Sequence, residues 1–287
     1  MAAEGHVIQS LLKLAQQQIT KSLSLDNQVA RMEARLLLQN LLGVSHAWLL
    51  AHESNLLDAS ICHQFQQQLQ RRLKGEPIAH ILGHREFFGL DLKVTAHTLI
   101  PRPDTETLVE AALHCIPESE PSKLLDLGTG TGAIALAIAS QRPHAEITAV
   151  DSSIMALEVA RENAKRLGIK HVSFIQSDWF SMLGEQRFDL IVSNPPYIAE
   201  SDIHLKQGDL RFEPLYALAS GEDGLDDIRQ IVNQAAAHLY QQGSLHLEHG
   251  YNQAAQVSAL MQSAGFSRIS HTKDLAGITR VTSGYLN

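Results

Sequence analysis

Residues Leu124–Ala133 read LLDLGTGTGA, in which a short apolar run leads into alternating glycines and threonines and then into a helical stretch. A strand, a tight loop and a helix in this order let the backbone approach a ligand closely and turn the amides at the helix N-terminus toward it. The sequence therefore predicts a cofactor at this loop. The residues expected to bind it are Gly128, Thr129, Gly130, Thr131 and Gly132.

The loop alone leaves two classes of cofactor open. Gly128, Gly130 and Ala133 also fit the dinucleotide pattern G-x-G-x-x-G/A, in which an acid such as Asp151 follows about 20 residues later. An acid at the end of the next strand can accept hydrogen bonds from a ribose diol, which nicotinamide and adenosyl cofactors both carry. A dinucleotide site does not require Asp126. That carboxylate either orients the loop, faces a cofactor's amino group, or is buried and satisfied by its own partners.

Strand and helix candidates alternate along the chain beyond Leu99, which predicts a mostly parallel sheet covered by helices on both faces. The strand candidates are Lys123–Leu127, Glu146–Asp151, Val172–Gln176, Phe188–Ser193, Gly243–Glu248 and Ser267–Thr272. The helical candidates include Ala133–Gln141, Ser153–Leu167 and Gly224–Leu239.

The chain is expected to have three parts. Residues 1–75 have helical periodicity that ends before Gly75 and Pro77, and they predict a small all-helical domain. Its apolar side chains recur at every fourth position, at Ile61, Phe65, Leu69 and Leu73. Residues 76–98 contain two glycines, Gly83 and Gly89, and a short apolar alternation, which predicts a β-hairpin linker. Residues 99–287 form the predicted cofactor-binding domain.

A second motif, SNPPY at Ser193–Tyr197, follows the fourth strand candidate. Two successive prolines stiffen the loop and remove two amide donors, so the loop accepts hydrogen bonds through its carbonyls. The Asn194 side-chain oxygen and the Pro195 carbonyl can accept the two hydrogens of a planar NH₂ group, while Tyr197 packs against its plane. Holding both hydrogens favours a pyramidal nitrogen whose lone pair points at an incoming methyl group. If a sulfonium carries that methyl group, the donor is already cationic, so the nitrogen does not have to be deprotonated by a strong base before it attacks.

Charge and composition restrict the partners. The 287 residues carry a formal net charge of −8, with 7 Lys and Arg against 5 Asp and Glu in residues 1–75 and a balance of −10 in the rest. A charge of −10 is a poor match for a phosphate backbone, so no direct nucleic-acid partner is expected. No apolar stretch approaches the roughly 18 to 20 residues of a membrane span, so no membrane partner is expected. The first 30 residues contain Glu4 and Asp26 and lack a signal-peptide pattern, which favours a cytoplasmic protein.

The remaining polar clusters predict no metal. Cys62 and Cys115 lie far apart without a C-x-x-C pattern, so neither a disulfide framework nor a zinc site is indicated. The best candidate ligands are His246, Glu248 and His249, but two or three ligands without a supporting cysteine do not make a zinc site. The one compact basic run, Arg71, Arg72 and Lys74, is interpreted as a solvated helix end, with a partner-docking patch as the alternative.

The two motifs together resemble class I methyltransferases that use S-adenosyl-L-methionine and modify exocyclic or amide nitrogens. These include adenine-N6 methyltransferases of DNA and RNA and glutamine-N5 methyltransferases of proteins. Three further segments are similar to the peptide chain release factor N5-glutamine methyltransferases, the PrmC/HemK family: GHREFFGL at Gly83–Leu90, LIPRPDTE at Leu99–Glu106, and DLAG at Asp274–Gly277 with Arg280. The resemblance spans nearly the whole chain. The chain departs from the family at His80, where tyrosine is more common, and at Ile278–Thr279, which are usually more polar.

The resemblance implies a Rossmann-like class I methyltransferase with a mostly parallel, seven-stranded sheet and a helical N-terminal domain. It implies that the glycine loop and Asp151 hold S-adenosyl-L-methionine and its product S-adenosyl-L-homocysteine, with Trp179 against the adenine and Asn194 beside the cofactor. The residues implied to bind the acceptor glutamine are Asn194, Pro195, Pro196 and Tyr197, of which Asn194, Pro195 and Tyr197 are assigned to catalysis.

The leading hypothesis is therefore methyl transfer to the glutamine of the Gly-Gly-Gln motif in class-1 peptide chain release factors, by a monomeric enzyme whose helical domain contacts the factor. The nearest alternative is an adenine-N6 methyltransferase of DNA or RNA, which needs the same grip on an NH₂ group but is disfavoured by the negative charge. A nicotinamide dehydrogenase would leave Asn194–Tyr197 without a role. A non-catalytic adaptor would not be expected to retain both motifs.

Overall fold

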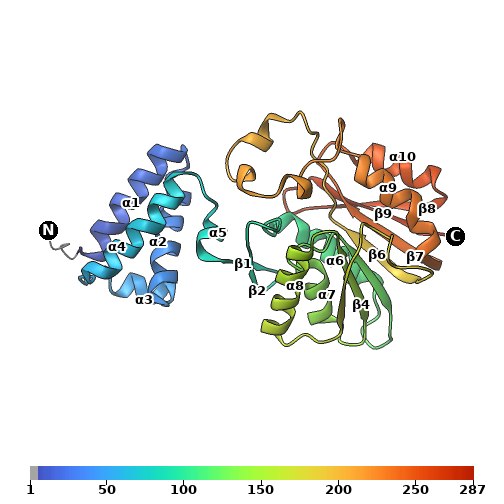
Figure 1. The fold of residues 1–287 in the computed structure, drawn as a ribbon, viewed down its shortest axis with the longest axis horizontal. Coiled ribbons are helices and arrows are strands. Elements are labelled where there is room, and N and C mark those ends of the chain that lie inside the picture. Colours follow the sequence, from blue (N-terminus) through green and yellow to red (C-terminus); the bar gives the residue numbers. More distant parts are fainter. Residues whose placement is uncertain (1–5) are drawn as a thin grey trace. The chain divides into compact units, whose positions relative to one another are not determined.

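The computed structural model describes residues 6–287, which divide into two compact units, one ending at Gly83 and one spanning His84–Asn287 (Figure 1). Residues 1–5, including Glu4 and the start of the expected 1–75 domain, lie outside the described part. Within residues 6–287, no helix combines the length and apolar character needed to cross a bilayer.

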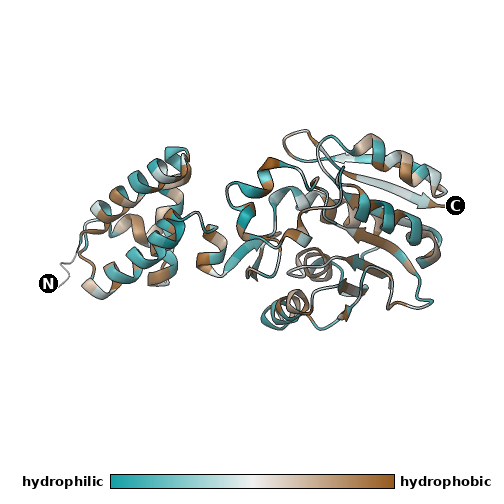
Figure 2. Ribbon diagram, turned by 45° about the horizontal axis from the view of Figure 1, so that its top comes forward, coloured by the Kyte–Doolittle hydropathy of each residue, from teal (hydrophilic) through white to brown (hydrophobic). Residues whose placement is uncertain are grey.

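The first unit is helical and has its own apolar core. Its helices are α1 (Ile8–Leu23), α2 (Asn27–Leu42), α3 (His46–Ala51), α4 (Ala59–Leu73) and α5 (Ile78–Leu82). The repeat of apolar residues at every fourth position correctly predicted α4, whose Phe65 and Leu69 are buried against α1 and α2. Figure 2 shows the resulting division of these helices into apolar and hydrophilic sides.

Helix α5 lies inside the range expected to be a hairpin linker. Its Ile81 belongs to the core of the helical unit, and the hairpin itself is confined to β1 (His84–Phe87) and β2 (Leu90–Lys93). Pro77 precedes the helix and Gly83 ends it with a left-handed φ of 79°. These two residues enclose only one turn of helix, which is too short to produce a recognisable periodicity.

The interpretation of the basic run as a solvated helix end is wrong for Arg72. Its side chain is only 4% exposed, and its Nε lies 2.8 Å from Oε2 of the buried Glu33 on α2. A second hydrogen bond joins Arg72 Nη2 to Glu33 Oε1 at 3.0 Å, which completes a bidentate pair. Arg71 is more exposed and pairs with Glu76. The run therefore includes a structural tie between α4 and α2.

Replacing Glu33 with Ala should destabilise the protein by about 3–5 kcal/mol, because it removes the carboxylate from a buried guanidinium. The matched control is Glu53→Ala, which breaks the more exposed pair with Arg35 and should cost at most about 1 kcal/mol. Urea unfolding of the full chain followed by circular dichroism measures both. Equal losses would show that burial of the Glu33–Arg72 pair does not matter.

The second unit is built on a seven-stranded sheet of order β5-β4-β3-β6-β7-β9-β8. Strands β3 to β7 are parallel, and β9 runs antiparallel to both of its neighbours. The strands are β3 (Lys123–Leu127), β4 (Glu146–Asp151), β5 (Val172–Gln176), β6 (Phe188–Ser193), β7 (Leu239–Glu248), β8 (Phe266–Lys273) and β9 (Thr279–Leu286). The predicted fold class is confirmed, and the first four strand candidates match these bounds.

Two predictions in the C-terminal part were wrong in detail. The expected helix Gly224–Leu239 is shorter, because α9 spans Asp226–Ala235 and a 3₁₀ turn, η5 (Ala236–His238), leads into β7 at Leu239. Strand β7 also begins before the expected Gly243, because Tyr240–Gln242 are exposed and do not continue the apolar run of the strand, although Leu239 is buried. Strand β9 was not among the candidates, since its buried centre contains Thr282, Ser283 and Gly284 in place of an apolar run.

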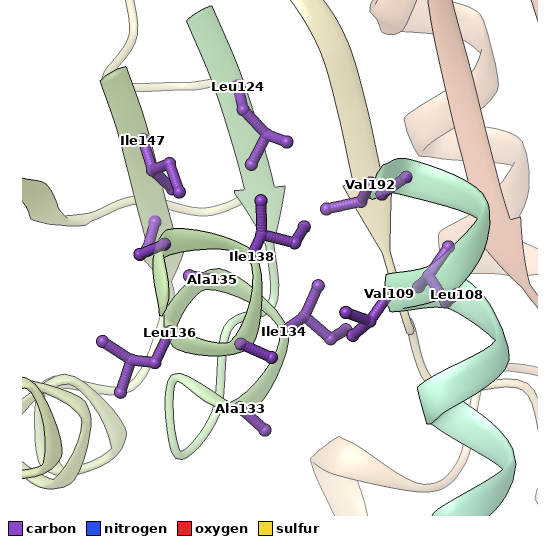
Figure 3. Packing of buried hydrophobic residues seen from close by; sticks show 14 of the residues in the cluster. Leu108, Val109, Leu124, Ala133, Ile134, Ala135, Leu136, Ile138, Ile147 and Val192 are labelled. Carbon is purple, nitrogen blue, oxygen red and sulfur yellow. The ribbon is translucent and has the colours of Figure 1, made fainter. Parts of the chain in front are cut away.

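Helices cover both faces of this sheet. On one face lie α6 (Glu106–Cys115), α7 (Ala133–Gln141) and α8 (Ile154–Leu167), and on the other lie α9 and α10 (Ala254–Ser263) (Figure 1). Successive residues of a strand point to opposite faces, so Leu124 packs against α7 while Leu125 joins the core beneath α9. Helix α7 is buried from Ala133 to Ala139 and packs on Leu124 and Ile147 (Figure 3).

The strand order places the site. From β3 the chain moves outward through β4 to β5, then returns to place β6 on the other side of β3. The carboxyl ends of β3 and β6 therefore border a topological switch point, where open α/β sheets bind their ligands. The glycine loop follows β3 and the SNPPY motif ends β6. The two motifs that the sequence analysis selected are thus brought to one crevice.

Candidate active site

The glycine loop is fixed to the strands on either side of it. The Thr129 amide donates to the Val150 carbonyl at 2.9 Å, and the Thr129 hydroxyl donates to Asp126 Oδ2 at 2.6 Å. Gly128 and Gly130 line the cavity beside the loop, whereas Thr129 and Thr131 are buried within it. Gly132 is the N-cap residue of helix α7, and a Cβ there would lie 3.2 Å from Ala160 of α8. Of the predicted loop residues, Gly128 and Gly130 therefore line the cavity where a ligand would bind, and the other three do not.

Asp126 acts on the loop and does not line the cavity. Its Oδ2 accepts hydrogen bonds from Thr129 and, at 3.3 Å, from the Ala135 amide. Its Oδ1 has no hydrogen-bond partner within residues 6–287. Burial raises the pKa of this carboxyl to about 7. Of the three roles considered for Asp126, which were orienting the loop, facing a cofactor's amino group, and being a satisfied buried carboxylate, these contacts favour the first.

Asp151 occupies the end of β4 and faces the cavity. Its Oδ2 accepts from the Gly130 amide and its Oδ1 from the Ser153 amide, both at 2.9 Å. A carboxylate has about four acceptor positions, so each oxygen keeps one for a ligand. Burial raises the pKa of Asp151, while the two amide bonds favour its charged form. The group is therefore held in place and able to accept two hydroxyl donors.

A cavity of about 350 Å³ unites most of the predicted cofactor residues. Its walls include Gly128, Gly130, Asp151, Trp179, Asn194 and Pro196. Trp179 adopts a left-handed φ of 45°, and a Cβ on Gly128 would lie 3.5 Å from its ring. The glycine thus leaves the ring beside the cavity accessible to a planar ligand. Volume, aromatic wall and ribose-type acceptor all fit an adenosyl group.

A smaller cavity of about 70 Å³ adjoins the first at the SNPPY motif. Pro195 and Tyr197 line only this cavity, whereas Asn194 and Pro196 line both. The Tyr197 carbonyl accepts from Gln253 Nε2 at 3.1 Å, and within residues 6–287 no donor is bonded to the Pro195 carbonyl. Burial raises the pKa of Tyr197 well above its usual range, which keeps its hydroxyl protonated. The motif therefore forms the wall between a large and a small compartment.

Gly224 is required for the position of this wall. Its φ is +74°, and a Cβ there would lie 2.3 Å from the Tyr197 carbonyl oxygen. We expect Gly224→Ala to displace the motif and to lower both the melting temperature and activity. The control is Gly208→Ala, which has a φ of +54° but no atom within 4 Å of the new Cβ and should cost only about 1–2 kcal/mol. Thermal unfolding and turnover assays would contradict this if the two variants behaved alike.

The segment Leu99–Glu106 lies against the site, although sequence reasoning gave it no role. The Ile100 amide donates to Glu213 at 2.8 Å, and Arg102 pairs with the same carboxylate. Further along, Arg280 on β9 pairs with Asp104 at 2.6 Å and with Asp274 at 2.9 Å. The family-like segments LIPRPDTE and DLAG are thus joined by one ion-pair cluster around Arg280.

Two buried residues near Asn194 were also missed. Asn194 Nδ2 donates to the Thr105 hydroxyl at 3.0 Å. Glu248, considered earlier only as a metal ligand, accepts from the Tyr197 hydroxyl at 3.4 Å. The sequence contained a signal for Thr105, since it belongs to the family-like LIPRPDTE segment. Its partners lie 89 and more residues away, so no local pattern reveals them.

The candidate ligands His246, Glu248 and His249 do not form a metal site. Within residues 6–287, no group of three or more His, Cys, Asp or Glu side chains is arranged to hold a metal ion. Burial lowers the pKa of His246 to about 4, so its imidazole is neutral. Its Nε2 lies 3.8 Å from Cys115 Sγ.

Comparison with known proteins agrees with this geometry. The family model described as the methyltransferase small domain matches residues 105–209, and the PrmC N-terminal domain matches residues 12–83. A release factor glutamine methyltransferase from Bordetella pertussis is 48% identical over 93% of this chain and 99% of that relative. One from Escherichia coli K12 is 49% identical over 88% of this chain and 91% of the relative. The structure of a T. thermophilus 16S rRNA methyltransferase in complex with AdoMet and guanosine covers 71% of this chain and 50% of that chain, with 22% identity and a TM-score of 0.51.

The sheet order, the crevice after β3 and β6 and the matched small domain define an S-adenosylmethionine-dependent methyltransferase of class I. Relatives nearly half identical over almost their whole length narrow the class further. The chain belongs to the release factor glutamine methyltransferases. This confirms the family, the enzyme class and the cofactor predicted from the sequence, and it favours neither a nicotinamide dehydrogenase nor an adenine-N6 methyltransferase.

Proposed function

We propose that this chain transfers a methyl group from S-adenosylmethionine to the side-chain amide nitrogen of a glutamine, and that Asn194–Tyr197 hold that amide. The observation that carries the proposal is the wall shared by the two cavities: Asn194 and Pro196 border both the large, adenosyl-sized compartment and the small one. An amide bound in the small compartment would therefore lie next to a cofactor bound in the large one, with Asn194 and Pro196 between them.

The large cavity would hold the cofactor, which supplies an electrophilic methyl group on a sulfonium. Asp151 would accept the ribose hydroxyls with the acceptor positions that Gly130 and Ser153 leave free. Trp179 would pack against the adenine ring. Gly128 and Gly130 would let the loop backbone lie close to the ligand.

The small cavity suits a carboxamide. The Asn194 side-chain oxygen and the Pro195 carbonyl are acceptors on a loop stiffened by two prolines, and each would take one hydrogen of the substrate NH₂ group. Tyr197 would pack against the amide plane. Fixed acceptors of this kind hold the nitrogen for in-line attack and stabilise the positive charge that it acquires on methylation.

The protein substrate is proposed from the relatives, which are named release factor glutamine methyltransferases. We propose class-1 peptide chain release factors as partners, with the glutamine of their Gly-Gly-Gln motif as the acceptor. The helical unit would contact the factor away from the reacting loop. A monomer acting without direct nucleic-acid contact remains our expectation.

Mass spectrometry of a release factor co-expressed with this chain tests the proposal. One added methyl group on the Gly-Gly-Gln glutamine is expected, and none on a factor whose glutamine is replaced by alanine. Equal labelling of both factors by radioactive cofactor would exclude glutamine as the acceptor. Label that disappears on nuclease treatment would point to the adenine-N6 alternative.

A further inference from the structure

Two buried residues that line neither cavity, Thr105 and Glu248, form hydrogen bonds with Asn194 and Tyr197 of the motif. Asn194 Nδ2 lies 3.0 Å from Oγ1 of Thr105, which is 4% exposed at the end of the 3₁₀ turn η1 (Pro103–Thr105). Glu248 lies at the end of β7 and is 1% exposed. Neither Thr105 nor Glu248 lines the large or the small compartment. Any effect of these two residues on the reaction must therefore pass through the motif.

The contact between Asn194 and Thr105 has two possible directions. A hydroxyl both donates and accepts, so Thr105 can pair with either end of the Asn194 amide. The amide nitrogen and oxygen have nearly the same shape, and the surrounding hydrogen bonds decide their orientation. With the nitrogen toward Thr105, the oxygen is left for the substrate. With the oxygen toward Thr105, the motif would present an NH₂ group to a substrate NH₂ group.

Glu248 removes this ambiguity. Glu248 Oε2 is a buried acceptor that has no hydrogen-bond partner within residues 6–287, and interaction with the Thr105 hydroxyl lowers the pKa of this carboxyl. An ionised carboxylate only accepts, so it takes the single hydroxyl hydrogen of Thr105. Thr105 Oγ1 can then only accept from Asn194, which must turn its nitrogen inward. The Tyr197 hydroxyl donates to the same carboxylate, so one buried group sets the direction of two hydrogen bonds behind the motif.

We propose that Thr105 is a positioning residue for methyl transfer: its hydroxyl, with the hydrogen given to Glu248, holds the Asn194 amide so that Oδ1 faces the substrate carboxamide. The proposal rests on the proposed function of the motif. It assigns a role to Thr105, the residue of the LIPRPDTE segment that hydrogen-bonds to Asn194, and it gives Glu248 a role other than metal binding.

The arrangement has a consequence for pH dependence. Burial raises the pKa of Glu248 to about 7, with a smaller opposing effect of Arg280 on β9 and a further raising effect of Asp104 on η1. The other group facing it is Tyr197, which stays protonated. When Glu248 gains a proton it can donate to Thr105, whose own hydrogen is then free to turn toward Asn194. Activity should therefore be full above the pKa of Glu248 and fall as the pH drops through it.

Steady-state kinetics of four variants of the full chain test the proposal, using a release factor as substrate. Thr105→Val keeps the shape but removes the hydroxyl, and it should lower kcat about 10- to 100-fold, with the KM for S-adenosylmethionine changed less than about twofold. Thr105→Ser should restore most of kcat. Glu248→Gln should have low kcat and lose the rise with pH near neutrality. Thr107→Val makes the same chemical change at a buried threonine on α6 that lines neither compartment, and serves as the control.

The proposal is overturned if Thr105→Val turns over like wild type, if Thr105→Ser is as slow as Thr105→Val, or if Glu248→Gln keeps the wild-type pH profile. If Thr105→Val does not fold by circular dichroism, the serine variant and the pH profile decide the question. A wild-type enzyme that does not methylate the factor would count against the proposed function. Wild-type methylation with an unaffected valine variant would count against the positioning role alone.

Discussion

Replacing Asn194 with Ala should lower kcat by about 100- to 1,000-fold and leave the affinity for S-adenosylmethionine nearly unchanged. The side-chain oxygen is expected to act on the nucleophile, and the cofactor is expected to be held by Asp151, Trp179 and the glycine loop. The loss should appear in single-turnover rates at saturating cofactor and substrate.

Cofactor affinity is measured separately by isothermal titration calorimetry of the same variant. A loss of affinity comparable to that of an Asp151 variant would show that Asn194 belongs to the cofactor site and not to the acceptor site. Thr107→Val again controls for loss of a buried polar group in the second unit. Circular dichroism spectra that match wild type would confirm that the substitution has not unfolded the protein.

Asp151→Asn should have the opposite effect to Asn194→Ala, namely weaker cofactor binding with little change in turnover. The carboxylate accepts the Gly130 and Ser153 amides and offers its remaining acceptor positions to the cavity. An amide has only one acceptor atom, so its NH₂ end would face a backbone donor and could not accept a ribose hydroxyl. We expect the dissociation constant for S-adenosylmethionine to rise about 10- to 100-fold. The turnover number at saturating cofactor should change much less.

A matched control exists at the other end of the same sheet. Asp189 accepts the Lys123 amide at 2.8 Å and lines neither compartment of the site. Asp189→Asn should therefore reduce stability slightly and leave cofactor binding intact. Similar losses of affinity in the two variants would mean that Asp151 acts through general stability and not through the ribose.

The sequence predicted the central strands well for a physical reason. Strands β3, β4 and β6 are buried, so they read as nearly continuous apolar runs bounded by polar or glycine residues. Strand β9 and the start of β7 lie outside this rule. The buried centre of β9 contains threonine, serine and glycine, and this strand is extended through its pairing with β7 and β8. In β7, Leu239 is buried but Tyr240–Gln242 are exposed, so the residues before Gly243 do not form an apolar run.

The site divides in the same way. The glycine loop and the Asn194–Tyr197 motif are each continuous in the sequence, so residue type and order were enough to select them as candidate site residues. Thr105 and Glu248 depend on contacts across 89 and 51 positions, and neither residue is unusual in its local sequence. The structure was needed to show that a threonine and a glutamate form hydrogen bonds with the motif.

The ion-pair cluster around Arg280 has a consequence for how this enzyme matures. Arg280 lies on β9, which follows every other strand in the chain, yet it binds Asp104 immediately before Thr105. A nascent chain that already contains both cavity motifs still lacks this clamp. The enzyme should therefore become active late in folding, when β9 inserts between β7 and β8. Removal of the residues from Thr279 onward by a protease should abolish activity, although none of the removed residues lines either cavity.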